Sequence, residues 1–371
     1  MSPTTVIQGC AVVTMDAGRT ELRTGHVVIE GNRISAVHAG AAPVIEGAHV
    51  VDGTGCLLTP GLVNTHHHLY QWVTRGLAID STLFEWLTTL YPIWAGIDEH
   101  AVNVAAKGGL AWLARTGCTL SSDHHYVFPR EGGDVFAATI EAACSVGLRF
   151  HPARGSMDLG RSQGGLPPDH VVEDTDAALN ATEAAINRWH DPGSDAMLQI
   201  AVAPCSPFSV TGELMREAAD LARRMGVLLH THLAETLDED SFCRERFGCS
   251  PLDYAESLGW TGSDVWLAHG IHFDDTALKR IGATSTGIAH CPTSNLKLGS
   301  GIAPVARMLA ACINVALGTD GAASNNRLDS SGATLIAELI ATGQALDPTM
   351  LPALGRAHLA PIARATAPRL H

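Results

Sequence analysis

From about residue 60 the chain alternates short apolar runs with helical patterns, and this alternation restricts the fold more than any other feature. Strands that alternate with helices are typical of parallel α/β architectures. Eight runs are candidate strands: 62–64, 118–122, 148–153, 199–203, 227–231, 265–268, 285–289 and 314–317. Helical patterns between them include 99–115, 135–146, 174–189 and 212–225. Eight such units predict a (β/α)8 TIM-like barrel.

The residues on either side of this region have a different pattern of apolar and turn-forming residues. Residues 4–52 contain short β-branched and apolar runs separated by Gly, Asn and charged turns, which predicts part of a small sheet. A helix could follow the eighth strand over 333–346, whereas 347–371 are rich in Ala and Pro without a strand pattern. We therefore expect a small β domain over 1–59, the barrel over 60–346 and an atypical tail over 347–371.

Three consecutive histidines follow the first predicted strand of the barrel, within TPGLVNTHHHLYQ (59–71). Side chains alternate along an extended segment, so His66 and His68 are expected on one side and His67 on the other. Two neutral imidazoles held in this way can bind one metal ion. A His-x-His pair is also common by chance, so the interpretation depends on the rest of the chain.

Polar residues come directly after the other predicted strands as well. Barrel enzymes place their chemistry at the carboxyl ends of the strands, where all eight meet. Five of the residues there also have structural interpretations, as buried hydrogen-bonded groups, a small apolar filler or a surface ion pair, and for these both readings stay open: His124, His125, His290, Cys205 and Arg154. The complete set is His66, His68, Asp123, His124, His125, Arg154, Cys205, His232, Glu235, His269, His290 and Asp320.

The strongest candidate metal ligands are His66, His68, His232 and Asp320. Three imidazoles and a carboxylate suit Zn²⁺ or Fe²⁺ and leave a position for a water molecule, whose pKa falls to about 7 on zinc. Glu235, three residues after His232, could act as general acid and base. His269 could stabilise charge on the attacked oxygen, and Asp320 could also take the proton of the water. The fourth predicted strand ends without a lysine, so one ion is expected rather than two.

Charge and composition exclude several other classes. The net charge of −14, with only three lysines, argues against a nucleic-acid or anionic-membrane surface, and a small neutral substrate is expected. No apolar stretch reaches the ~20 residues of a membrane span, and the first ten residues lack the pattern of a signal peptide. Nine cysteines without a C-x-x-C pair fit reduced thiols. We therefore expect a cytoplasmic protein.

Several motifs together resemble the amidohydrolase superfamily, and within it the mononuclear-metal aminohydrolases. These motifs are PGLVNTHHHLYQ, THLAET, LAHG, HCPTSNLKLGSG and GTDGAASNN. Four further segments are most similar to the 8-oxoguanine deaminases: LYPIWA, DHHYVFP, RGSMDLG and PCSPFSV. The resemblance implies metal binding by His66, His68, His232 and Asp320, and proton transfer by Glu235, His269 and Asp320. Gln71 and Arg154 are candidates for binding the lactam edge of the substrate.

The implied reaction is hydrolytic deamination of an oxidised purine, with 8-oxoguanine giving uric acid and ammonia and one divalent ion as cofactor. Alternatives are an isoxanthopterin or cytosine type of deaminase, or a hydrolase that displaces chloride or an alkylamine from a triazine. Members of the superfamily usually return to the small sheet after the barrel, and residues 347–371 lack that pattern. The small sheet is therefore expected to be incomplete, which leaves a non-catalytic family member as a further alternative. A homo-oligomer is compatible with this, because a second subunit could cover unpaired edges.

Overall fold

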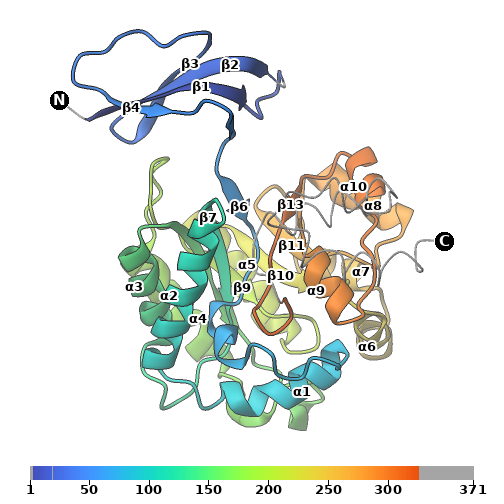
Figure 1. Cartoon of the computed structure of the whole chain (residues 1–371). Helices are drawn as coiled ribbons and strands as arrows, with labels where there is room; N and C mark the ends of the chain where they lie inside the picture. The colour runs from blue at the N-terminus through green and yellow to red at the C-terminus, as the bar shows by residue number, and fades with distance from the viewer. Residues whose placement is uncertain (1–2, 19, 326–371) are drawn as a thin grey trace. The chain divides into compact units, whose positions relative to one another are not determined.

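The computed structural model describes residues 3–18 and 20–325. It divides the chain into two compact units, Met1–Gly61 and Leu62–His371, which are described separately below (Figure 1). The predicted helix over 333–346 and the predicted tail over 347–371 lie outside the described residues.

The first unit is a small five-stranded sheet, in agreement with the β-rich pattern of residues 4–52. Its order is β3–β2–β1–β4, and β5 pairs with β1 beyond the end of β4. Strands β1, β2 and β3 are antiparallel neighbours, whereas β4 and β5 run parallel to β1. A small core contains Cys10, Val12 and Val27. The strands are β1 (Thr4–Val13), β2 (Glu21–Glu30), β3 (Arg33–Ala39), β4 (His49–Asp52) and β5 (Leu57–Leu58).

The second unit is built on eight parallel strands in chain order, which confirms the predicted barrel. The strands are β6 (Leu62–Asn64), β7 (Cys118–His125), β8 (Arg149–Ser156), β9 (Ala201–Pro204), β10 (Leu229–Leu233), β11 (Val265–His269), β12 (Gly287–His290) and β13 (Val315–Leu317). The N–H of Thr65 donates to the carbonyl of Leu317 at 2.9 Å. This bond joins the first strand to the last and closes the ring.

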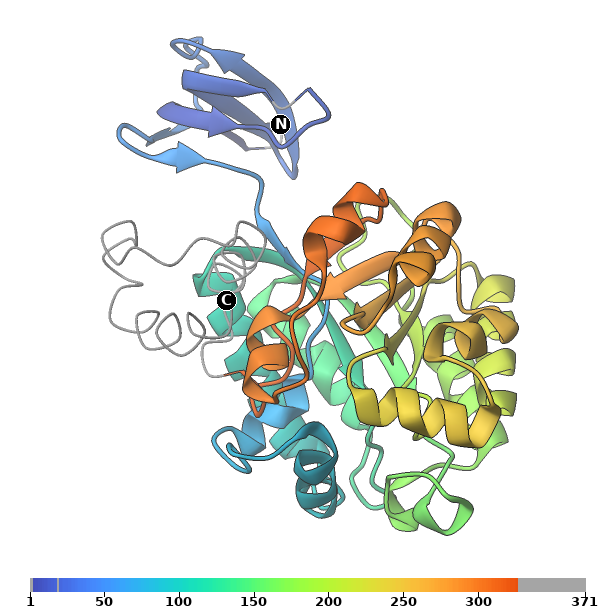
Figure 2. The same ribbon diagram turned by 90° about the vertical axis from the view of Figure 1, so that its right-hand side faces the viewer.

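Helices surround these strands (Figures 1 and 2). They are α1 (Leu83–Trp94), α2 (Glu99–Arg115), α3 (Val135–Val146), α4 (Thr175–Trp189), α5 (Gly212–Met225), α6 (Leu237–Phe247), α7 (Pro251–Ser257), α8 (Asp275–Thr284), α9 (Pro292–Lys297) and α10 (Val305–Ala310). The described part of the unit also contains three short 3₁₀ helices: η1 (Leu69–Thr74), η2 (Arg161–Gln163) and η3 (Asp169–Val171). None of the helices among the described residues combines the length and the apolar character that a membrane span requires.

Local sequence explains where the helices begin and end. The carboxylates of Asp98, Asp134 and Asp174 accept a backbone N–H at the starts of α2, α3 and α4, which satisfies donors that have no partner within the helix. Helix α5 ends at Gly226, whose φ of 68° lies in the left-handed region that glycine tolerates. These signals account for the close agreement between the predicted and observed helices.

Strands β7 to β12 extend further toward their carboxyl ends than the apolar runs predict, whereas β6 and β13 end at the predicted residues. Strand β7 continues to His125 and β8 to Ser156, and His125 lies opposite Arg154 in the parallel pairing. The side chains of His125 and Arg154 are buried. In β7 and β8 apolarity therefore marks only the first part of the strand, because the side chains toward the carboxyl end are polar.

Candidate active site

The carboxyl ends of the strands bring the predicted polar residues into one buried cluster. His66 and His68 follow β6, His232 lies on β10, and Asp320 follows β13. Each of these four side chains is at most 9% exposed to solvent. Residues remote in the sequence therefore meet at one end of the barrel.

The spacing of the donor atoms suits a single metal ion. His68 Nε2 lies 3.2 Å from His232 Nε2, and Asp320 Oδ1 lies 3.3 Å from His68 Nε2 and 3.5 Å from His66 Nε2. Ligand atoms about 2.0–2.2 Å from a tetrahedral zinc ion are separated by about 3.3–3.6 Å. The Nε2 atom of His66 is buried and makes no hydrogen bond. An unpaired buried lone pair beside a carboxylate fits a metal ligand.

Backbone carbonyls fix the orientation of two of the imidazoles. His68 Nδ1 donates to the carbonyl of His124 at 2.7 Å, and His232 Nδ1 donates to the carbonyl of Cys205 at 2.7 Å. A carbonyl only accepts, so the proton is on Nδ1 and the lone pair is on Nε2 in both rings. The two Nε2 atoms therefore face each other without a proton between them, which is an arrangement that a shared cation stabilises.

The ionisation states also suit metal binding. Burial lowers the pKa of His66 well below its ordinary value and that of His232 to about 3, so both rings are neutral. Burial alone would raise the pKa of Asp320, but the surrounding histidine cluster, to which His269 contributes with its own raised pKa, holds it well below its usual range. Neutral imidazoles and an ionised carboxylate are the forms that bind a divalent ion.

Other histidines of the cluster offer alternative donor sets. Three further triads have nitrogens within 4.8 Å of one another: His66, His232 and His269; His66, His124 and His230; and His68, His124 and His232. His124 Nε2 donates to the carbonyl of Ala203 at 2.8 Å, which leaves its lone pair on Nδ1, a buried atom without a hydrogen-bond partner. Both nitrogens of His230 have partners, His66 and the carbonyl of Trp266. The proposed set differs from these triads in including Asp320, whose carboxylate supplies the negative charge that a divalent ion neutralises.

Glu235 and His269 lie side by side next to the metal-binding cluster. Glu235 Oε2 is 3.4 Å from His269 Nε2, and the hydroxyl of Ser300 donates to Glu235 Oε1 at 3.4 Å. Burial raises the pKa of Glu235 to about 7, so the carboxyl group can both accept and release a proton near neutrality. His269 Nδ1 donates to Asn295 Oδ1 at 2.9 Å, which leaves Nε2 for the pocket.

The backbone around these groups is held in unusual conformations. Ala234, His269 and Asp320 have φ values of 54°, 75° and 58°, in the region that side chains other than glycine rarely adopt. The carboxylate of Glu239 accepts the N–H groups of Ala234 and Glu235 at 2.8 and 3.0 Å. Strain of this kind is concentrated at functional sites. Glu239 was not predicted as a site residue. It is a buried carboxylate in the first turn of α6, four residues after Glu235.

A small pocket opens beside this cluster. Its cavity measures about 30 Å³, which is the space that one water molecule occupies in the liquid. Helix α1 contributes Leu83, Trp86, Leu87 and Tyr91 to the wall, so the aromatic segment over 83–96 packs against the pocket. The other lining residues are His68, Gln71, Tyr126, Cys205, Ser206, Phe208, His232, Glu235, His269, Leu298, Asp320 and Ser324. A bicyclic ring can enter only if side chains of this wall move.

The structure brings Gln71 to the pocket but does not bring Arg154 there. Gln71 Nε2 donates to the hydroxyl of Tyr126 at 3.3 Å, and its Oε1 is buried without a partner. Arg154 instead donates to both carboxylate oxygens of Glu173 at 2.9 and 2.6 Å, and its guanidinium stacks on the ring of Phe128. A substrate contact by Arg154 stays a prediction. Tyr126 was missed as a pocket residue, although it belongs to the DHHYVFP segment.

The remaining predicted positions have structural partners or lie deeper in the protein. His125 Nε2 donates to the carbonyl of Val127, and Asp123 accepts the N–H of Leu69. Cys205 lines the pocket, and burial raises the pKa of its thiol to about 12. Both ring nitrogens of His290 are buried without a hydrogen bond, and burial lowers its pKa to about 4.

Comparison with known proteins gives the class that the fold and the site define. The Amidohydrolase family model matches residues 57–353, and the chain belongs to this family. It is 46% identical over 331 residues to an 8-oxoguanine deaminase of Pseudomonas aeruginosa, covering 88% of this chain and 73% of that protein. It is 38% identical over 339 residues to an isoxanthopterin deaminase of an unknown prokaryotic organism, covering 88% and 70%.

A solved structure with the same fold contains a metal. The atrazine chlorohydrolase of Arthrobacter aurescens TC1, complexed with zinc, has a TM-score of 0.83 and 32% identity, and the match covers 87% of this chain and 73% of that one. These findings confirm the resemblance inferred from the motifs, including the expected deaminase and triazine hydrolase relatives.

Proposed function

We propose that this protein catalyses the metal-dependent hydrolytic deamination of an oxidised purine, with 8-oxoguanine converted to uric acid and ammonia. The observation that carries the proposal is the buried cluster of three imidazoles and a carboxylate with Glu235 and His269 beside it. The identity to an 8-oxoguanine deaminase supports the choice of substrate.

His66, His68, His232 and Asp320 would hold the ion, which we propose is Zn²⁺, with Fe²⁺ as the alternative. The nitrogen and oxygen donor set and the zinc in the related chlorohydrolase support zinc. A bound divalent ion of this kind lowers the pKa of a water molecule, which makes the water a nucleophile near neutral pH.

The residues of the chain would then move protons. The water oxygen bonds to the ring carbon that carries the amino group, and Asp320 accepts a proton from the water. Glu235 donates a proton to the adjacent ring nitrogen. His269, whose pKa is raised by Glu235 and Asp320 against the effect of burial, is protonated on both nitrogens and donates Nε2–H to the attacking oxygen. The exocyclic nitrogen would then receive the proton held by Asp320, its bond to carbon would break with the electron pair leaving on nitrogen, and ammonia would depart. Glu235 would recover a proton from the hydroxyl group as that group becomes the carbonyl.

Gln71 is the proposed substrate-binding residue of the pocket. Its buried Oε1 has no partner and can accept a hydrogen bond from a ring N–H. Arg154 remains a second candidate for the lactam edge, although it could act there only by leaving Glu173. Aromatic walls from Tyr91, Trp86 and Tyr126 suit a flat heterocycle.

A second candidate function keeps the same site but changes the ring or the leaving group. Isoxanthopterin or a cytosine-type ring could be deaminated, or chloride or an alkylamine displaced from a triazine. The isoxanthopterin deaminase and the atrazine chlorohydrolase among the relatives favour these alternatives. A non-catalytic protein is the remaining alternative, and the complete ligand set argues against it.

The test is a metal analysis of the purified protein followed by a substrate screen. The proposal expects about one divalent ion per chain and ammonia release fastest with 8-oxoguanine, with isoxanthopterin, guanine, cytosine and hydroxytriazines compared at equal concentration. Release of chloride or alkylamine from triazines in place of ammonia would favour the second candidate. If the protein held no metal and turned over none of these compounds, the remaining alternative, a non-catalytic protein, would be supported.

We further propose a cytoplasmic enzyme acting on a small neutral substrate, without nucleic-acid or membrane partners. Nine free cysteines and the net charge of −14 support this. A homo-oligomer is compatible with the exposed edge strand β4 of the small sheet.

A further inference from the structure

One of the three proposed imidazole ligands is oriented differently from the other two. His68 and His232 donate Nδ1–H to backbone carbonyls, which no side-chain substitution removes. His66 Nδ1 instead lies 2.8 Å from Nε2 of His230, another fully buried side chain. The protonation pattern of His66 therefore depends on the identity of residue 230.

The next hydrogen bond in the chain fixes the direction of this one. His230 Nδ1 lies 2.8 Å from the backbone carbonyl of Trp266, which can only accept, so Nδ1 of His230 carries a proton. Neutral His230 then has its lone pair on Nε2 and accepts from His66. His66 must donate from Nδ1, and its own lone pair is left on Nε2, the buried atom without a hydrogen-bond partner that faces Asp320.

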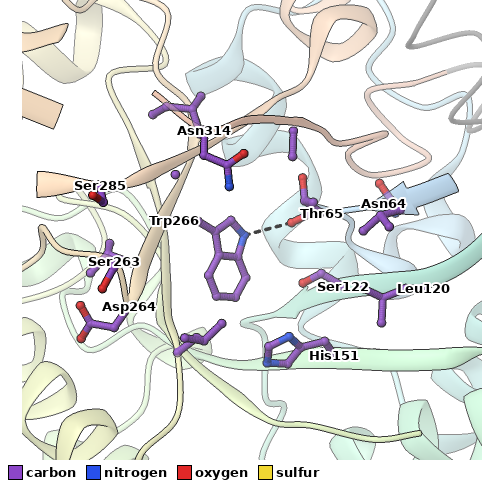
Figure 3. Close-up of a pocket in the computed structure, with 16 residues that line it drawn as sticks. Asn64, Thr65, Leu120, Ser122, His151, Ser263, Asp264, Trp266, Ser285 and Asn314 are labelled. Atoms are coloured by element: carbon purple, nitrogen blue, oxygen red, sulfur yellow. Dashed lines mark hydrogen bonds between the residues drawn. The ribbon is translucent and has the colours of Figure 1, made fainter. Parts of the chain in front are cut away.

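Trp266 holds His230 through its ring as well as through its carbonyl. The indole stacks on the imidazole with centroids 4.3 Å apart and an interplanar angle of 14°. The indole N–H donates to the carbonyl of Thr65, which is the residue before His66, at 3.1 Å (Figure 3). Buried alanines Ala153, Ala201 and Ala203 form a small cluster against which Trp266 packs inside the barrel.

Trp266 also separates the cluster from the other end of the barrel. Its side chain lines a cavity of about 260 Å³ among residues at the amino-terminal starts of the strands, including Ser263, Asp264 and Asn314 (Figure 3). The imidazole of His230 thus lies between the His66 ring and the indole, with a defined partner on each nitrogen.

We infer that His230 and Trp266 are positioning residues for the metal site, and that they act by fixing the tautomer and ring orientation of His66. This inference rests on the proposed metal site. Removal of a side chain that orients a metal-bound histidine typically weakens metal binding about 10–100-fold. A residue that merely filled the barrel would change stability without a selective effect on the ion.

The test compares two substitutions of the same residue. His230→Leu removes both hydrogen bonds, whereas His230→Gln keeps a carbonyl acceptor and an N–H donor on one side chain. The dissociation constant for Zn²⁺ is measured by competition with a chromophoric chelator at fixed pH, and the unfolding temperature of the metal-free protein is recorded beside it. We expect His230→Leu to bind zinc about 10–100-fold more weakly and His230→Gln to recover most of that loss.

A matched control applies the same chemical change elsewhere in the barrel. His151 lies on β8 beside the cavity at the amino-terminal end, 5.8 Å from the Trp266 ring by centroid, and contacts none of the proposed ligands in the described structure. His151→Leu should bind zinc as the parent does. Parental zinc affinity in His230→Leu, or equal losses in His230→Leu and His151→Leu, would overturn the inference.

A measurement on the unchanged sequence covers the case in which His230→Leu does not fold. In metal-free protein labelled with ¹⁵N-histidine, the two-bond ¹H–¹⁵N correlation of His66 should show the proton on Nδ1, with the signal assigned by its loss in His66→Gln. A proton on Nε2 would overturn the inference. Zinc affinity is read without substrate, so failure of the proposed deamination and failure of this inference remain distinguishable.

Discussion

The two ends of the barrel strands differ in what their side chains do. At the carboxyl end, buried carboxylates and imidazoles have shifted pKa values, and Ala234, His269 and Asp320 adopt strained backbone conformations. At the amino end, Asp264 forms a partly exposed ion pair with Arg223, and the positive φ of Ser285 there, 60°, belongs to the cap that ends α8. Local chemistry at the carboxyl end thus departs from what stability alone favours, which is expected where residues are selected for reactivity.

The largest expected effect at the carboxyl end comes from removing a ligand. His68→Ala takes away an imidazole that lies 3.2 Å from His232 and 3.3 Å from Asp320. We expect the metal content, measured by mass spectrometry, to fall from about one ion per chain to near zero and deamination to disappear. Activity is also expected to be lost when a chelator strips the parent protein and to return on addition of zinc. Full metal content in His68→Ala would contradict the ligand assignment.

A smaller loss is expected when the proton carrier is changed and the ligands are kept. Glu235→Gln preserves the size of the side chain but removes its acid–base function beside His269. We expect the metal content to stay at the parental level while kcat falls about 10²–10⁴-fold, the usual contribution of general acid–base catalysis. A variant that still turns over at close to the parental rate would remove Glu235 from the mechanism.

A substitution at Gly321, which lies behind Gln71 in the pocket wall, should raise KM more than it lowers kcat. A Cβ at position 321 would overlap Gln71 Oε1, so Gly321→Ala must displace the amide proposed to bind substrate. Loss of one hydrogen bond worth about 1.4 kcal/mol raises KM about tenfold. The measurement compares steady-state kinetics of Gly321→Ala and Gln71→Ala, which should show similar increases. Parental KM in both variants would exclude Gln71 as a substrate contact.

The smallest effect is expected at the amino end. Asp264→Asn breaks the ion pair with Arg223, whose Nε lies 2.9 Å from Asp264 Oδ2 with both side chains partly exposed. Exposed pairs of this kind contribute about 0–1 kcal/mol, so the free energy of unfolding in urea should fall by no more than about 1 kcal/mol. The kinetic constants should stay at the parental values. A large loss of activity in Asp264→Asn would break the contrast between the two ends.

Sequence periodicity was sufficient to predict the barrel and the helices that begin at aspartate caps. The ligand positions were also accessible, because each follows an apolar run directly. His230 could have been found by the same reasoning, since it lies two residues before His232 on one strand and therefore faces the same side. Its pairing with His66 depends on strand packing, which the sequence does not encode locally.

Other contacts were beyond sequence reasoning because they join distant segments. Arg154 follows a predicted strand as the site residues do, yet its guanidinium pairs with Glu173 in the connection before α4. Glu239 was not distinguishable from the other acidic residues at the start of α6, Asp238 and Asp240, until burial separated it from them. Side-chain partners at these positions follow from tertiary packing and not from spacing.

The closure of the barrel determines when the proposed metal site is complete. Thr65 and Leu317, which join the first and last strands, are 252 residues apart, and His66 and Asp320 flank this junction. During synthesis the histidine pair leaves the ribosome long before the aspartate does. A growing chain therefore offers an incomplete set of the proposed ligands until its eighth barrel strand has been translated and docked, so we expect capture of the proposed ion to be coupled to the end of folding.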